Sequence, residues 1–185
     1  ELRKKKNQIN ADNANNVQNQ NDFDNIDNTT DTTDTTNIKS IESFEDMNLK
    51  EGLLRGIYAY GWERPSDVQK RGIIQVIQGR DSIIQAQSGT GKTGTFSIAT
   101  LEKVDEKEKT CQCVVLNPTR EIADQTCHVM TNLSLYLKNI KICGVIGGRR
   151  LNNNDVSQSH IIVATPGRIY DMIMRGIINM NEIIK

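Results

Sequence analysis

The sequence lacks an excess of either charge, a long apolar run and an apolar amino-terminal signal segment. Lys plus Arg number 23 and Asp plus Glu number 23, so the formal net charge is zero and any site for a polyanion has to be local. No apolar stretch approaches the roughly 20 residues that span a bilayer, and the first residues are charged and Asn-rich instead. We therefore expect a soluble intracellular protein, cytoplasmic or nuclear, with no membrane partner.

Cysteine is sparse, and its spacing contains no CxxC pair. The close pair falls in an apolar run that we interpret as a strand. We predict free, mostly buried thiols in a reducing compartment, with metal binding as the alternative. The four residues concerned are Cys111, Cys113, Cys127 and Cys143.

Large apolar residues are nearly absent from the amino-terminal segment. From Asn7 to Asn37 the chain is dominated by Asn, Asp and Thr, so it cannot bury enough surface to offset the entropy lost on ordering. We predict that residues 1–42 form a disordered, Asn-rich low-complexity tail and that residues 43–185 form one folded domain.

Two helices are expected at the start of this domain. Apolar residues recur at helical spacing from Leu49 to Tyr58, and Gly61 supplies a stop, which predicts an amphipathic helix over residues 50–60. A second helix is expected to begin at the N-cap Ser66 and to end at Gly79.

Short β-branched runs then alternate with segments long enough for crossover helices. This order predicts an α/β fold in which a parallel sheet carries helices on both faces. Each run is followed by a turn rich in Gly, Pro or Thr, and such turns at the carboxyl ends of parallel strands form an edge that suits phosphates. The expected strands are Ser82–Ala86, Cys113–Leu116, Ile140–Ile146 and His160–Ala164.

The turn after the first run has the chemistry of a nucleotide site. Residues 86–93, AQSGTGKT, fit the P-loop pattern GxxxxGK[ST] except that Ala86 replaces the first Gly. In that pattern backbone amides close around the α- and β-phosphates, Lys92 reaches the β- and γ-oxygens, and the Thr93 hydroxyl ligates Mg²⁺. Lys92 and Thr93 are therefore the candidate catalytic residues. The predicted binding loop comprises Ser88, Gly89, Thr90, Gly91, Lys92 and Thr93.

A P-loop that begins with Ala86 instead of Gly resembles that of the DEAD-box family of ATP-dependent RNA helicases, whose P-loop reads AxSGTGKT. Residues 61–69, GWERPSDVQ, resemble the family's Q motif, and Phe44 stands where the family places an isolated aromatic. Residues 118–125, PTREIADQ, resemble PTRELAxQ, and residues 165–168 match TPGR. The resemblance covers nearly all of the folded domain and implies a RecA-like fold. It is greatest to the subfamily that contains translation initiation factor 4A and its exon-junction-complex paralogue.

The resemblance to the Q motif implies adenine recognition, with ATP as the cofactor. The Gln69 amide can accept from the adenine N6 amino group and donate to N7, a pattern that guanine reverses. The family stacks its isolated aromatic on the base, which implies the same for Phe44, although an aromatic before a helix is in general more often a core anchor. Arg64 belongs to the same motif and is included in the site. Trp62 stands where the family has Phe, and we interpret it as a packing residue.

The same resemblance implies that three turns of this chain bind RNA. In the family they hold consecutive phosphates of one RNA strand, so binding should ignore base sequence and weaken with salt. For any single turn, the alternative is a helix N-cap with no ligand. The candidate residues are Pro118, Thr119, Arg120, Gly147, Gly148, Thr165, Gly167 and Arg168.

The carboxylates that hydrolyse ATP in the family are missing from this sequence. The family carries them in an Asp-Glu-Ala-Asp strand, whereas the one Asp-Glu pair here, Asp105-Glu106, sits in a charged loop. We expect residues 43–185 to be the first lobe of a helicase, truncated before that strand and inactive alone, whose full-length parent hydrolyses ATP and unwinds short duplexes. The alternative is a catalytically inactive module that binds RNA or partners. Expected partners are single-stranded or short duplex RNA and helicase-regulating scaffold proteins, and the chain is expected to be monomeric.

Overall fold

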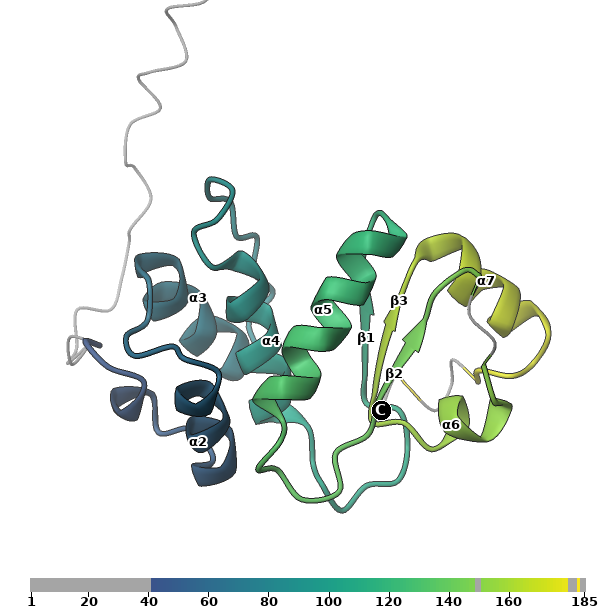
Figure 1. Ribbon diagram of the computed structural model, residues 1–185, viewed down its shortest axis with the longest axis horizontal. Coiled ribbons are helices and arrows are strands. Elements are labelled where there is room, and N and C mark those ends of the chain that lie inside the picture. Colours follow the sequence, from purple (N-terminus) through teal and green to yellow (C-terminus); the bar gives the residue numbers. More distant parts are fainter. Residues whose placement is uncertain (1–40, 149–150, 180–182, 184–185) are drawn as a thin grey trace, which may run out of the picture. The chain divides into compact units, whose positions relative to one another are not determined.

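The computed structural model describes residues 41–148, 151–179 and 183 of the 185-residue chain. Nearly all of the predicted disordered tail, residues 1–42, lies outside the described residues. Helices and strands alternate along most of the described chain (Figure 1). In chain order they are η1 (Glu45–Met47), α2 (Glu51–Ala59), α3 (Asp67–Ile77), α4 (Lys92–Lys103), β1 (Cys113–Leu116), α5 (Arg120–Leu133), β2 (Ile142–Val145), α6 (Asn153–Ser157), β3 (Ile161–Ala164) and α7 (Pro166–Met174).

The two helices predicted before the first strand are present. α2 buries Leu53 and Ile57 on its apolar face, as the helical spacing indicates. α3 begins after its N-cap Ser66, whose backbone has the extended conformation typical of that position. Gly79 follows the end of α3 with a φ of 80°, a left-handed conformation that glycine adopts without steric cost.

A parallel sheet with the strand order β1-β3-β2 forms the centre of the described domain. β3 pairs with both neighbours in parallel, and its last residue, Ala164, lies beside Leu116 of β1 and Val145 of β2. The three strands therefore end side by side. This confirms three of the four predicted strands, with small shifts at the ends of two of them.

Helices cover both faces of this sheet. Ile161 and Val163 of β3 pack into one hydrophobic cluster with residues of α2, α3, α4 and α5. Ile162 and Ala164, which point the opposite way, pack into a second cluster with residues of α6 and α7. Figure 1 shows α5 on one side of the sheet and α6 and α7 on the other. The predicted α/β architecture is confirmed.

The predicted strand Ser82–Ala86 is wrong as an element: residues 81–87 form neither strand nor helix. Among the described residues, no strand pairs with this segment. Ile83 is 100% exposed, and residues 82–85 and α3 together line a groove of about 510 Å³. An extended segment becomes a strand only when a neighbour satisfies its amides and carbonyls, and water does so where no neighbour exists. The β-branched composition of this segment therefore could not reveal that the segment has no partner strand among the described residues.

None of the helices in the described ranges is long and apolar enough to cross a membrane.

Because residues 83–86 pair with no strand among the described residues, we predict fast hydrogen exchange at their backbone amides. Amides of residues 83–86 should exchange with solvent at least about a hundredfold faster than those of residues 161–164, because exchange at exposed, unpaired amides does not require opening of the sheet. Hydrogen exchange read by mass spectrometry or NMR on the 185-residue chain measures both segments in one sample. Equal protection in the two segments would show that residues 83–86 have found a partner strand in solution.

Candidate functional site

The P-loop leads directly into α4. Gly89 and Gly91 have φ angles of 82° and 100°, a backbone conformation that side chains other than glycine rarely adopt. Gly91 is the N-cap of α4 and supplies no side-chain cap, so the amides of the first helical turn are not satisfied by a capping side chain. An uncapped helix N-terminus next to a left-handed glycine loop is a favourable geometry for an anion such as a phosphate.

The side chains of the P-loop are held within the loop itself. The Lys92 ammonium donates to the carbonyl oxygens of Ala86 and Gln87, and the Thr90 hydroxyl donates to the same Gln87 oxygen at 2.8 Å. An ammonium has three donors and rotates on a flexible stem, so Lys92 can exchange these carbonyls for phosphate oxygens without moving the backbone. Thr93 is half-buried in the first turn of α4. Its hydroxyl fits the role of one oxygen ligand of Mg²⁺, with phosphates and waters as the others.

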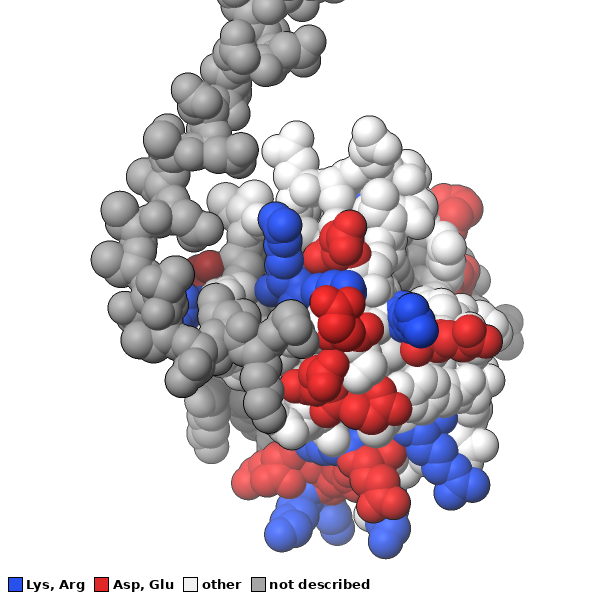
Figure 2. All heavy atoms as spheres, turned by 90° about the vertical axis from the view of Figure 1, so that its left-hand side faces the viewer, with Lys and Arg blue, Asp and Glu red and all other residues white. Residues whose placement is uncertain are grey.

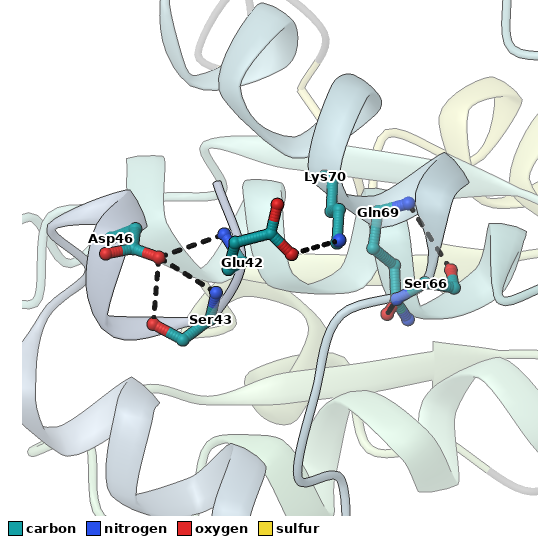
Figure 3. Close-up of polar contacts among 6 residues, drawn as sticks. All are labelled: Glu42, Ser43, Asp46, Ser66, Gln69 and Lys70. Atoms are coloured by element: carbon teal, nitrogen blue, oxygen red, sulfur yellow. Dashed lines mark hydrogen bonds and ion pairs between the residues drawn. The ribbon is translucent and has the colours of Figure 1, made fainter. Parts of the chain in front are cut away.

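The start of α3 lies against the P-loop. Ser66 and Gln69 form a reciprocal capping box, in which the Gln69 Oε1 accepts from the Ser66 amide at 2.9 Å (Figure 3). The Ser66 hydroxyl also donates to the Thr90 carbonyl at 2.8 Å. Gln69 is only 5% exposed, and its Nε2 lies 2.9 Å from the position that a Cβ on Gly91 would occupy. The structure therefore joins the Q-motif residues to the phosphate loop, and the capping box was not anticipated from the sequence.

Phe44 lies in the hydrophobic core, with 0% of its surface exposed. Its ring packs edge-on against Tyr58 at a centroid distance of 6.4 Å, and the Tyr58 hydroxyl, by hydrogen bonding, lowers the pKa of the Glu45 carboxyl. This placement agrees with the core-anchor alternative and leaves no free ring face for a base. The segment is nevertheless tied to α3, because Glu42 forms an ion pair with Lys70 at 2.9 Å (Figure 3).

Arg64 is exposed in the turn before α3. Figure 2 shows the face of the molecule that lies on the left in Figure 1, where α2 and α3 are found. Acidic and basic side chains lie next to one another on this face. The described part of this face therefore offers a charged ligand no patch of a single charge sign.

The three predicted RNA turns follow the three paired strands and so come together at one edge. The Asn117 amide after β1 donates to the Ala164 carbonyl at 2.9 Å, and the Thr165 amide after β3 donates to the Val145 carbonyl at 3.4 Å. In Figure 1 the loop before α4 and the turns before α5 and α7 all lie toward the top of the view. The register of the sheet thus continues into the turns that carry the candidate residues.

Arg120 connects the first and second of these turns. Its Nε and Nη2 lie 3.1 Å from the position that a Cβ on Gly147 would occupy, so any larger residue at 147 would displace the guanidinium. Thr119 is the N-cap of α5, and its hydroxyl oxygen accepts from the Ile122 amide at 3.3 Å. Pro118, Arg120 and Gly148 are exposed. Backbone amides, a hydroxyl and a guanidinium therefore lie together, a set of donors that suits phosphate oxygens.

The third turn differs because its arginine is already paired. Arg168 Nη1 lies 2.8 Å from a carboxylate oxygen of Asp171, which also pairs with Arg175 at 2.7 Å. Thr165 occupies the N-cap position of α7 without a side-chain cap, and Gly167 is exposed in the first turn. Sequence reasoning missed Asp171, although its spacing of three residues from Arg168 is the ion-pair spacing of a helix.

The cysteines carry no sign of a metal site. Burial raises the pKa of Cys111 and of Cys143 to about 11, and burial also raises the pKa of Cys113, so these thiols stay protonated at neutral pH. None of the four cysteines, all of which lie in the described ranges, forms a disulfide. Within the described ranges, no group of three or more His, Cys, Asp or Glu residues is arranged to hold a metal ion.

Comparisons with known proteins agree with this geometry. Residues 66–184 match the DEAD/DEAH box helicase family. The chain is 49% identical to eukaryotic initiation factor 4A of Drosophila melanogaster over 142 residues, which is 75% of this chain and 35% of that protein. It is 53% identical to the ATP-dependent RNA helicase FAL1 of Meyerozyma guilliermondii over 135 residues, which is 71% of this chain and 34% of that protein.

Solved structures give the same picture at lower identity. A DEAD box protein from Methanococcus jannaschii superposes with a TM-score of 0.71 at 34% identity, covering 77% of this chain and 39% of that one. Saccharomyces cerevisiae Dbp5, bound to RNA and ADP BeF3, superposes with a TM-score of 0.69 at 32% identity, covering 74% and 35%. The chain thus spans little more than a third of the relatives it matches. Together with the P-loop and the turns at the ends of paired strands, these matches show that the chain belongs to the DEAD/DEAH box helicase family.

Proposed function

We propose that this chain is the ATP- and RNA-binding first lobe of an ATP-dependent RNA helicase. The observation that carries the proposal is the convergence of four turns of phosphate-binding chemistry, one of them a P-loop held against a buried Gln69. In the proposed arrangement the P-loop takes the phosphates of ATP·Mg²⁺, and the other three turns take the phosphates of one RNA strand.

Adenine selection is assigned to Gln69 and not to Phe44. The Gln69 Oε1 keeps one lone pair free when it accepts from the Ser66 amide, and Nε2 carries two donors, so the capping box leaves the amide able to bind a base edge. Phe44 is buried in the hydrophobic core, and the nearby Glu42 forms an ion pair with Lys70, the residue after Gln69. Its stacking on adenine stays a prediction that requires the ring to move.

Base preference is testable by calorimetry. The chain should bind ADP more tightly than GDP, and Gln69→Ala should weaken ADP binding by the equivalent of one or two hydrogen bonds, about 1 to 3 kcal/mol, with little effect on GDP. Gln75→Ala is the matched control, because it removes the same side chain from an exposed position of α3, and Lys92→Ala should weaken both nucleotides alike. Equal affinity of the parent chain for ADP and GDP would exclude adenine recognition.

RNA binding is assigned to the edge where Arg120 meets Gly147. The Arg120 guanidinium is exposed and forms no ion pair with another described residue, whereas that of Arg168 is shared with Asp171. We therefore expect Arg120 to contribute more of the salt-dependent affinity than Arg168. Neither contact reads a base, so the proposed binding is independent of sequence. Dbp5, a structural relative of this chain, has been solved with RNA and ADP BeF3 bound at the same time.

A salt titration separates these contributions. Arg120→Ala should weaken binding to single-stranded homopolymers of different base composition equally and flatten the slope of log affinity against log salt by roughly 0.7. Arg168→Ala should give a smaller change. Arg55→Ala, the control, removes an arginine charge from α2, away from the three turns, and should leave the slope unaltered. Fluorescence anisotropy measures RNA binding by all three variants. If Arg120→Ala behaves like Arg55→Ala, the first turn is a helix cap and the RNA assignment fails.

Hydrolysis and unwinding are proposed for the complete protein. The relatives named ATP-dependent RNA helicases are about three times longer than the region matched, since that region covers 34% to 35% of them. Dbp5 has been solved with Gle1 and with Nup159, which supports the proposal that scaffold proteins regulate helicases of this type. The monomeric state and the cytoplasmic or nuclear compartment stay predictions.

The 185-residue chain by itself should show no RNA-stimulated ATP turnover above that of Lys92→Ala, because its sequence lacks the Asp-Glu-Ala-Asp carboxylates that position the attacking water and Mg²⁺. A phosphate-release assay with and without RNA measures this. Turnover that disappears in Lys92→Ala would place the catalytic carboxylate elsewhere within these residues.

A further inference from the structure

Gly94, in the first turn of α4, lies where two side chains from the Q-motif segment leave no room. A Cβ at this position would lie 2.6 Å from Gln69 Nε2, 2.7 Å from Trp62 Cη2 and 2.9 Å from Trp62 Cζ3. Real Cβ atoms essentially never approach other heavy atoms this closely, so any side chain here would force a neighbour to move. Glycine is also a poor helix former compared with alanine. Its presence inside α4 therefore calls for a steric reason, and this contact supplies one.

Neither neighbour can yield easily. Trp62 is a rigid double ring that stacks edge-on against Tyr60, with ring centroids 5.0 Å apart and planes at 81°. Gln69 is buried, and its Oε1 is fixed by the Ser66 amide at 2.9 Å. The Gln69 amide is therefore confined between its own capping box and the surface of the P-loop helix. Its position depends on the space that Trp62 and Gly94 leave between them.

Gly72 provides a contrast at the same pair of helices. A Cβ there would meet Thr95 Cγ2 at 2.6 Å and Ile84 Cδ1 at 2.8 Å, an equally close approach of α3 to α4. Neither of those neighbours is Gln69 or a P-loop residue. A substitution at Gly72 thus disturbs the packing of the two helices without pressing on the amide.

We infer that Trp62 and Gly94 form a size-matched pair that positions the Gln69 amide over the P-loop and so sets the preference for adenine. Both act as positioning residues, because they place Gln69 and do not themselves meet the phosphates. The inference rests on the proposed nucleotide-binding function. It identifies Trp62, which is half-buried and stacked on Tyr60, as a determinant of base selection in addition to a packing residue.

A double-mutant cycle on the 185-residue chain tests the pair, with ADP and GDP affinities measured by calorimetry and melting temperatures measured alongside. Gly94→Ala should lower the ratio of ADP to GDP affinity about tenfold, equivalent to one lost hydrogen bond. Trp62→Phe, which removes Cη2 and Cζ3 from the contact, should lower the ratio less. The double variant should return to within about threefold of the parent ratio, because the smaller ring makes room for the methyl group. Gly72→Ala should lower the melting temperature and leave the ratio unchanged.

The outcomes separate the inference from the function on which it rests. A parent chain that does not prefer ADP refutes the proposed adenine recognition. A parent that prefers ADP while Gly94→Ala keeps the same ratio overturns the inference, as does a double variant with a ratio no better than that of Gly94→Ala. If Gly94→Ala does not fold, the comparison is between Trp62→Phe and the double variant: a higher ratio in the double variant supports the pair, and an equal or lower ratio overturns it.

Discussion

The pairing of β3 with both of its neighbours is the constraint on which the rest of the described structure depends. All four residues of β3 are buried, and alternate residues belong to the two hydrophobic clusters on opposite faces of the sheet. The same register ends the three strands side by side, so the turns before α5 and α7 and the glycine pair after β2 have to converge. Loss of this central strand would disrupt both clusters and the edge at which RNA binding is proposed.

A second constraint acts where the Q-motif segment meets the P-loop. Ser66 uses its amide and hydroxyl to hold Gln69 and Thr90 at once, so the cap that starts α3 also fixes the loop that starts α4. A helix cap is normally a local device worth about 1 kcal/mol. Here it joins two segments that are 24 residues apart, so the amide proposed to recognise the base and the loop proposed to bind phosphates share one hydrogen-bonded unit.

Local patterns in the sequence predicted the elements whose reasons are local. Helical spacing, the Ser66 cap and the β-branched run at residues 113–116 all specify structure through neighbours in the chain. The prediction failed at Ser82–Ala86, because a strand needs a partner that composition does not reveal. It was incomplete at Phe44 and Arg168, whose surroundings depend on Tyr58 and on the ion pair with Asp171. The sequence motifs therefore identified candidate site residues, and the structure supplied the contacts that those residues make.

The two halves of the proposed site are supported in different ways. The RNA turns follow hydrogen-bonded strands, whereas the P-loop follows residues 81–87, which pair with no strand among the described residues. The P-loop is positioned instead by α3 and by the packing of α4 against α5, the helix that begins at Arg120. In the described chain, α4, which begins at Lys92, contacts α5, which begins at Arg120, and it also shares a hydrophobic cluster with β3. Because residues 82–86 pair with no strand among the described residues, the register that aligns the three proposed RNA turns does not extend to the P-loop.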